Sequence, residues 1–374
     1  MPRLIATGLA IILIASVLLA VRALFGIVWL DPYVSALVGA CLLGLAVVVL
    51  GWSGRRWSAR RARMALFPII LLTASVALML VALEWIARFA FWDIHSSADA
   101  RTYLALRELP YRSNSLGFRD REIPPKTPDH YRIVVVGDSI TWGQGVDEDE
   151  RFSNLIQHDL GPGYEVINFG MRAYDMPEHL KALDKVLTLS PDFVLLQLYI
   201  NDFETRRMRR PVARPLLPWP DLDRRLLASS VFYGMMETQW YRFQENAHWV
   251  ESYREYMERH LRDPDSPDSR QSFGMLRDFF RRTAAAGVPT GVVIFPNPNL
   301  LGRGYPYAYL HNRIREICLQ ERVEYIDLQP VFAKMGDSRG LWANRFDQHP
   351  NARAHRRAVD EMLAKFGPVW RAPH

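Results

Sequence analysis

The chain has 374 residues, of which 49% are hydrophobic and 23% charged, and its formal net charge is +6. The hydrophobic residues are concentrated in the first ninety or so positions, and the remainder is long enough to bury one α/β core. Cys41 and Cys318 are the only cysteines, which argues against a disulfide framework or a cysteine metal site.

Three apolar stretches near the start are each long enough to cross a bilayer as a helix, which needs about 20 residues. They run from Leu4 to Val21, from Tyr33 to Trp52 and from Met64 to Leu83. A cleaved signal peptide is the alternative for the first stretch, but Ala20-Val21-Arg22-Ala23 is a poor cleavage site and two more stretches follow. We therefore predict a membrane anchor of three transmembrane helices over residues 1–92.

Arginines between the second and third stretches predict the orientation of this anchor. They are Arg55, Arg56, Arg60, Arg61 and Arg63, with no acidic residue among them. A short loop with such an excess of positive charge stays in the cytoplasm, so three crossings place the chain after about Trp92 outside it. A nucleic-acid or lipid-headgroup patch is the alternative, but the flanking stretches favour topology, and we expect no nucleic-acid partner. The prediction is a multi-pass inner-membrane protein with a periplasmic C-terminal domain.

The rest of the chain is organised as a linker followed by an alternating domain. Residues 93–130 are polar and broken by prolines, and residues 131–374 form the domain. Apolar runs predict strands at 133–136, 164–169, 193–200, 290–295 and 323–328. Helical patterns occur at 152–160, 177–189, 273–286, 307–320 and 351–366. This alternation predicts an α/β fold with five parallel strands covered by helices on both faces.

Residues 203–270 interrupt the alternation with a helical insertion that is basic at its start and then rich in aromatic residues. The insertion leaves the carboxyl end of the third strand, where α/β sheets bind ligands. Two interpretations remain open. The insertion is either a lid that shapes the substrate site or a helical excursion that docks on the core or on the membrane surface.

Ser139 directly follows the first strand, in Gly137-Asp138-Ser139. Its hydroxyl would project at the carboxyl edge of the sheet beside backbone N–H groups, which suits a nucleophile if a base lies nearby. Taken alone, this tripeptide also fits a simple turn or helix cap. We expect Asp138 to hold the loop by hydrogen bonds and not to act as an acid.

A second candidate segment is Asp347-Gln348-His349-Pro350-Asn351. A histidine can remove the serine proton and return it to the leaving group, and a carboxylate can fix its tautomer. Taken alone, the segment also fits a turn before a helix. His355, six residues after His349, is expected on the surface of the closing helix.

Two strand ends carry candidate oxyanion donors. Gly170 ends the second strand and Asn201 the third, and a backbone N–H or a side-chain amide can stabilise the oxyanion of an acyl-transfer intermediate. Either residue alone is common at a strand end. With Ser139 after the first strand, and Asp347 and His349 after the fifth, all five residues are expected at one edge of one sheet.

These residue types, in this order, resemble the SGNH hydrolases, also called GDSL esterases, of the membrane-anchored bacterial type. The resemblance covers about Arg132 to Gly367 apart from the insertion. It implies a three-layer α/β/α sandwich with a five-stranded parallel, flavodoxin-like sheet. The roles that it implies are nucleophile for Ser139, base for His349, triad acid for Asp347, and oxyanion donors for Ser139, Gly170 and Asn201.

The chain departs from the family pattern at one position. Many members place the acid three residues before the histidine, where this chain has Phe346, whereas the spacing of two resembles relatives that act on cell-envelope polysaccharides. The segment 114–119 also resembles the lead-in of membrane-tethered members, with a linker turn as the alternative. No histidine–carboxylate cluster has the spacing of metal ligands, so we expect no metal and no cofactor.

The predicted function is that of a membrane-anchored serine esterase. It would form an acyl-enzyme and hydrolyse an O-acyl ester, such as an O-acetyl ester, of an envelope carbohydrate or lipid. The first alternative is an O-acyltransferase acting on an envelope polysaccharide, which would require a partner membrane protein to supply acyl groups. The second is a non-catalytic glycan-binding module, which the complete set of catalytic residue types disfavours.

Overall fold

The computed structural model describes residues 75–87, 113–205, 208, 213–301, 304–336, 338–343 and 347–371. The predicted transmembrane stretches lie outside these residues, except for the end of the third. Within the described part of the chain, no helix combines the length and apolar character needed to cross a membrane. The described residues belong to two compact units: 75–87 with 214–241, and the remainder.

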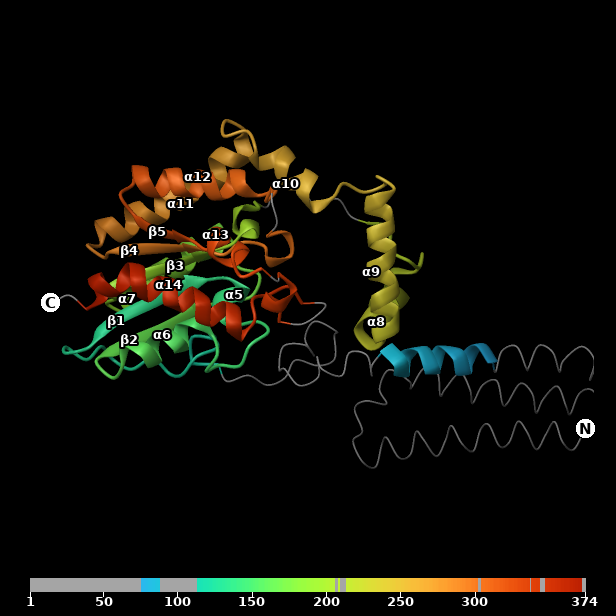
Figure 1. Ribbon diagram of the computed structural model, residues 1–374, viewed down its shortest axis with the longest axis horizontal. Helices are drawn as coiled ribbons and strands as arrows, with labels where there is room; N and C mark the ends of the chain where they lie inside the picture. The colour runs from blue at the N-terminus through green and yellow to red at the C-terminus, as the bar shows by residue number, and fades with distance from the viewer. Residues whose placement is uncertain are drawn as a thin grey trace, which may run out of the picture. The chain divides into compact units, whose positions relative to one another are not determined.

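The second unit is built on the predicted sheet of five parallel strands, in the order β2-β1-β3-β4-β5 (Figure 1). Val136 of β1 pairs with Phe169 of β2 on one side and Leu196 of β3 on the other. The chain therefore changes direction across the sheet between β1 and β3, which is where α/β sheets open a crevice for ligands. The strands are β1 (Tyr131–Gly137), β2 (Tyr164–Gly170), β3 (Phe193–Leu198), β4 (Thr290–Ile294) and β5 (Glu324–Asp327).

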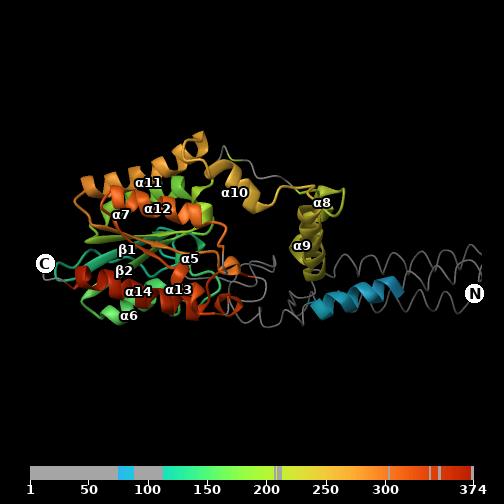
Figure 2. The ribbon, with the colours of Figure 1, turned by 45° about the horizontal axis from the view of Figure 1, so that its top comes forward.

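Helices cover both faces of the sheet, as predicted (Figure 2). One face carries α7 (Met176–Thr188), α10 (Tyr253–Leu261), α11 (Pro267–Ala285) and α12 (Ala308–Gln320). The other carries α6 (Phe152–Leu160), α13 (Gln329–Ala333) and α14 (Ala352–Trp370). Side chains alternate along each strand, so Val134 and Val136 pack on the first face and Ile133 and Val135 on the second.

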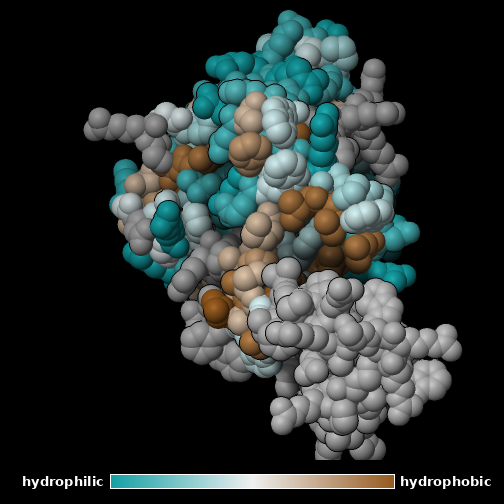
Figure 3. Space-filling model, turned by 90° about the vertical axis from the view of Figure 1, so that its right-hand side faces the viewer, coloured by the Kyte–Doolittle hydropathy of each residue, from teal (hydrophilic) through white to brown (hydrophobic). Residues whose placement is uncertain are grey.

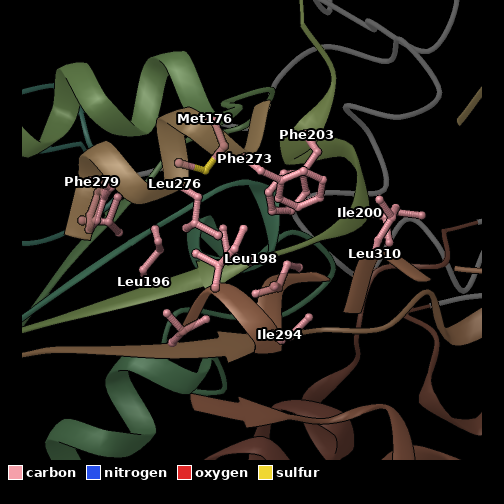
Figure 4. Packing of buried hydrophobic residues seen from close by; sticks show 14 of the residues in the cluster. Met176, Leu196, Leu198, Ile200, Phe203, Phe273, Leu276, Phe279, Ile294 and Leu310 are labelled. Atoms are coloured by element: carbon pink, nitrogen blue, oxygen red, sulfur yellow. The ribbon is translucent and has the colours of Figure 1, made fainter. Parts of the chain in front are cut away.

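Hydrophobic packing on the first face reaches the carboxyl end of β3 (Figure 4). The rings of Phe203 and Phe273 stack with their centroids 4.6 Å apart, and both side chains are buried. Phe203 ends the short 3-10 helix η4 (Ile200–Phe203), which contains Asn201. The core of α11 therefore anchors the turn that presents Asn201.

Helix boundaries follow capping residues more than hydrophobic periodicity. Helix α11 starts at Pro267, six residues before the predicted 273, because the Ser266 hydroxyl accepts a hydrogen bond from the Ser269 N–H and caps the helix. Helix α14 starts after Asn351, which caps the Ala354 N–H, and it continues to Trp370, beyond the predicted 366. Short elements complete the second unit: α5 (Ser139–Trp142), η5 (Pro298–Leu300) and η6 (Arg339–Leu341).

The insertion is helical, as predicted, and its parts belong to different units. Helix α8 (Pro220–Ser229) and most of α9 (Val231–Asn246) lie in the first unit with residues 75–87. There the Glu84 carboxylate accepts hydrogen bonds from the backbone N–H groups of Val231 and Phe232, both at 3.1 Å, at the start of α9. Helix α10 instead packs on the core of the second unit. The packing of α10 fits the docking interpretation for that part of the insertion, and the lid interpretation stays open.

Candidate active site

The candidate nucleophile lies at the junction of β1 and α5. Gly137 ends the strand, Ser139 is the first residue of the helix, and one Asp138 carboxylate oxygen accepts a hydrogen bond from the Ile140 N–H at 2.9 Å. Gly143 ends the helix in the left-handed conformation, with φ of +87°. The expected loop-holding contact of Asp138 is therefore present, and it fixes the backbone on which Ser139 lies.

The structure brings Ser139, His349 and Asp347 together as the sequence predicted. The Ser139 Oγ lies 2.8 Å from the His349 Nε2, and the His349 Nδ1 lies 2.5 Å from the Asp347 Oδ1. The backbone N–H of His349 donates to the same carboxylate oxygen at 3.0 Å. This is the geometry of a nucleophile, a base and an orienting acid.

Asp347 is suited to remain ionised beside the imidazole. Its side chain is 3% exposed, and burial by itself would raise its pKa. The hydrogen bonds and charge of His349, together with a contact from the Gln144 amide at 3.4 Å, outweigh burial and hold the pKa of Asp347 below its usual value. A charged Asp347 stabilises the imidazolium that forms when His349 takes a proton.

Asn201 shares a cavity of about 290 Å³ with the serine and the histidine. Its position in η4, after β3, places it at the same sheet edge as Ser139. A side-chain amide here can donate to an oxyanion formed at Ser139. The cavity is lined by Ser139, Ile140, Tyr199, Asn201, Pro298, Asp347, Gln348, His349 and Pro350.

Gly170 makes its contacts with neighbouring residues inside the protein. Its N–H donates to the Asn168 Oδ1 at 2.9 Å, while the Asn168 Nδ2 donates to the Thr141 carbonyl at 2.6 Å. A Cβ at position 170 would lie 2.3 Å from the Trp142 nitrogen, so glycine allows α5 to approach β2 closely. The Gly170 amide thus already has an acceptor within the protein, and its role in the oxyanion hole stays a prediction.

The end of the predicted linker is part of the active-site scaffold. Arg119 is buried and donates to the carbonyls of Gly143 at 2.9 Å and Val146 at 3.3 Å, directly after α5. The Asp120 carboxylate accepts from the Asn168 N–H at 2.7 Å. Residues 113–130 therefore belong to the second unit, in which the buried charges of Arg119 and Asp120 find these partners.

His355 was expected on the surface, and this expectation is wrong. The side chain is fully buried, with its ring stacked on Phe152 and its Nδ1 accepting the Phe152 N–H at 3.2 Å. Burial lowers the pKa of His355 to about 3, so the ring is neutral. The face of α14 that carries His355 packs against α6. The spacing of six residues from His349 does not indicate which face of the helix is buried.

Two further residues support the site without a clear signal in the sequence, and a third has an unusual backbone conformation. Gln144 contacts Asp347 across 203 positions of chain, and Arg119 binds the end of α5. Ala173, in the loop after β2, has φ of +61°, a conformation that a non-glycine residue adopts at a cost of about 1 kcal/mol. Among the described residues, no group of three histidine, cysteine or acidic side chains could hold a metal ion.

Comparison with known proteins identifies the family. The model of the GDSL-like lipase/acylhydrolase family matches residues 135–357, and no curated protein sequence matches the chain. Similar solved structures include TesA, which is 17% identical with a TM-score of 0.40, over 64% of this chain and 99% of that one.

Two others are the psychrotrophic esterase EstA from Pseudoalteromonas sp. and a catalytic mutant of Axe2, an acetylxylan esterase from Geobacillus stearothermophilus. EstA is 16% identical with a TM-score of 0.39, covering 64% of this chain and 97% of its own. Axe2 is 15% identical with a TM-score of 0.38, covering 65% and 97%. Because the family match spans more than half of the sequence and includes both Ser139 and His349, this chain belongs to the GDSL-like lipase/acylhydrolase family and is an esterase-type hydrolase.

Proposed function

We propose that this esterase is anchored in the inner membrane and removes short O-acyl groups, such as acetyl, from an envelope carbohydrate or lipid outside the cytoplasm. The observation that carries the proposal is the 2.8 Å contact between the Ser139 Oγ and the His349 Nε2, in a cavity of about 290 Å³. The acyl carbon of an ester bound in this cavity would be within reach of the serine oxygen.

The chemistry follows from these groups. His349 takes the Ser139 proton as Oγ attacks the ester carbonyl, and the Asn201 amide and the Ser139 N–H donate to the oxyanion. His349 then protonates the departing alcohol, which leaves an acyl-enzyme on Ser139. A water molecule then attacks the acyl carbon while His349 takes its proton. His349 passes this proton to the Ser139 Oγ as the acyl–oxygen bond breaks, so the carboxylic acid is released and the serine hydroxyl is restored.

The size and lining of the cavity support a short acyl group on a polar alcohol. Ligand cavities commonly have about 300–1,000 Å³, so this one is at the small end. Tyr199, Asn201 and Gln348 bring an aromatic ring and two amides to its wall. A small cavity with a tyrosine and two amides on its wall offers hydrogen-bonding groups to a polar alcohol and leaves little room for a long acyl chain.

The membrane location is supported by the three apolar stretches and by the exposed surface of the first unit. On the helix 75–87, Leu78 is 71% exposed, Ile86 63% and Trp85 50%, and on the insertion Trp219 is 61% exposed. Hydrophobic residues also interrupt the hydrophilic surface in Figure 3. Exposed apolar side chains in such numbers are typical of surfaces that contact a membrane or another protein.

A chain-length series tests the chemistry. The full-length chain, purified in detergent, is assayed with 4-nitrophenyl acetate, butyrate and octanoate. We expect kcat/KM to be highest for acetate and to be lost in Ser139→Ala. Equal activity of Ser139→Ala and the unaltered enzyme would refute the serine mechanism, and a preference for octanoate would refute the short acyl group.

Analysis of the cell envelope tests the substrate. A strain that lacks the protein should accumulate O-acyl groups on an envelope glycan or lipid, and the unaltered gene but not Ser139→Ala should reverse this. Loss of O-acyl groups in the same strain would instead support the acyltransferase.

A fusion protein tests the proposed membrane orientation. Alkaline phosphatase fused to the C-terminus should be active, because that enzyme matures only outside the cytoplasm. An inactive fusion would contradict the proposed orientation.

A further inference from the structure

A second histidine–carboxylate pair is buried next to the turn that presents Asn201. The His179 Nε2 lies 3.2 Å from the Asp202 Oδ1, and neither side chain is exposed to solvent. His179 comes from α7, and Asp202 belongs to η4 and directly follows Asn201. The other Asp202 oxygen accepts a hydrogen bond from the Tyr199 N–H at 2.7 Å, which closes the turn.

Asp138 adds a second carboxylate to this buried cluster. It is 1% exposed, and its Oδ2 is buried with no hydrogen-bond partner among the described residues. Its charge interacts with those of Asp202 and His179. The His179 imidazole therefore lies next to Asp202 and within electrostatic range of Asp138 and Asp175. Asp138 immediately precedes the nucleophile, and Asp202 immediately follows the candidate oxyanion donor.

The His179 Nδ1 is buried with no hydrogen-bond partner among the described residues, so the charges around the ring determine whether it is protonated. An ionised Asp202 buried without a cation would be strongly destabilising. Burial lowers the pKa of His179. The charges of Asp202, Asp138 and Asp175 and the hydrogen bond that the ring donates to Asp202 outweigh burial, so the pKa lies above its ordinary value. Burial and the charge of Asp202 raise the pKa of Asp138 to about 7.

We propose that His179 is a positioning residue of this esterase, a buried cation that holds Asp202 and thereby fixes the turn that directs the Asn201 amide toward the oxyanion. The inference rests on the proposed function of Ser139 and Asn201. His179 does not touch the substrate. It acts through Asp202 on one oxyanion donor and through its charge on Asp138, the residue before Ser139.

This role predicts a particular kinetic signature. An oxyanion donor acts in the transition state, so its displacement lowers kcat and leaves KM nearly unchanged. Loss of the His179 proton, as the pH rises through its raised pKa, should lower kcat. The groups that face His179 are Asp202 from η4, Asp138 from the loop before α5, and Asp175 and Tyr174 at the start of α7.

The test compares the full-length enzyme with His179→Asn and with His179→Asn/Asp202→Asn, using 4-nitrophenyl acetate from pH 6 to pH 10. We expect His179→Asn to lower kcat roughly tenfold to 100-fold at neutral pH, with KM within about threefold. The double variant should recover part of this loss, because two amides can hydrogen-bond without a buried unpaired charge. The alkaline decrease of kcat should be absent from both variants. His158→Asn, at an exposed position of α6, is the matched control and should behave like the unaltered enzyme.

A kcat of His179→Asn within twofold of the unaltered enzyme would overturn the inference, as would a rise in KM alone. If His179→Asn does not fold, the double variant decides, because an alkaline decrease that persists in it contradicts the role of His179. These outcomes are distinct from failure of the proposed function. In that case the unaltered enzyme itself would lack hydrolysis that depends on Ser139.

Discussion

One carboxylate oxygen of Asp347 accepts hydrogen bonds from both the ring Nδ1 and the backbone N–H of His349, at 2.5 and 3.0 Å. The two residues are thus held by one short turn of the kind that aspartate side chains form with the backbone two residues on. The Ala343 N–H, which donates to the His349 carbonyl at 2.8 Å, ties this turn to the preceding loop. A spacing of two residues between acid and base is therefore compatible with a triad.

Asp347→Asn tests the acid. The substitution retains the shape of the side chain but removes its charge, so the imidazolium loses its stabilisation and the ring can adopt the wrong tautomer. We expect kcat with 4-nitrophenyl acetate to fall by about 10²–10⁴-fold, with little change in KM. Asp149→Asn, at an exposed position, is the control and should leave both constants unchanged. A fall of less than threefold in Asp347→Asn would contradict the assignment.

The dependence of the unfolding free energy on pH gives a second test of Asp347. The pKa of Asp347 is lowered in the folded chain, so the group stabilises the fold above its unfolded pKa, which is about 4. This contribution is lost as the pH falls through the lowered pKa. We expect the difference in unfolding free energy between the unaltered chain and Asp347→Asn to be constant above about pH 5 and to shrink below pH 4. Urea denaturation across this range measures it, and a difference that grows toward acid would be inconsistent with the lowered pKa.

Gly170→Ala tests whether glycine is required for close packing. The new Cβ would overlap backbone atoms of Thr141 and Trp142, which cannot move without displacing α5. We expect the unfolding free energy to fall by about 3 kcal/mol or more. Gly274→Ala is the matched control, because no atom lies within 4 Å of its added Cβ in α11, and it should stabilise the chain by about 0.5–1 kcal/mol. Equal stability of the two variants would refute the packing argument.

Arg119→Gln tests whether the lead-in segment holds the nucleophile helix. The guanidinium binds carbonyls just after α5 and lies 4.5 Å from the Trp142 ring, so its loss removes a charged donor from the Val146 carbonyl and leaves the Gly143 carbonyl with only the Val146 N–H at 3.3 Å. We expect a loss of about 1–3 kcal/mol in unfolding free energy and a lower kcat. Arg254→Gln removes an exposed pair with Glu258 and should change stability by less than about 1 kcal/mol. A stable and fully active Arg119→Gln would mean that residues 113–121 act only as a linker.

The sequence predicted the sheet because buried parallel strands are nearly continuous apolar runs. Ile133–Val136 and Phe193–Leu198 carry this pattern, and each faces both layers of helices. Because Ser139, Asn201 and His349 each follow a predicted strand, the sequence also predicted that they lie at one edge of the sheet. The same logic did not predict α5, because a helix of four residues has too few positions to show a period.

Buried polar contacts were the part that the sequence did not reveal. The partners of Arg119, Gln144 and His179 are 24, 203 and 23 positions distant, and no local pattern indicates which side chains meet. For the same reason, His355 was placed on the surface although α14 buries it against α6. Such contacts depend on how helices rotate when they pack, and a single sequence constrains that rotation only weakly.

The most direct test of the account is covalent labelling of the full-length enzyme with a fluorophosphonate, followed by peptide mapping by mass spectrometry. Because the imidazole of His349 activates the hydroxyl at 2.8 Å, we expect one adduct, on Ser139, which forms at least about 100-fold more slowly in His349→Ala and not at all in Ser139→Ala. An adduct on a different residue, or labelling of Ser139 at an unchanged rate in His349→Ala, would contradict the catalytic pair.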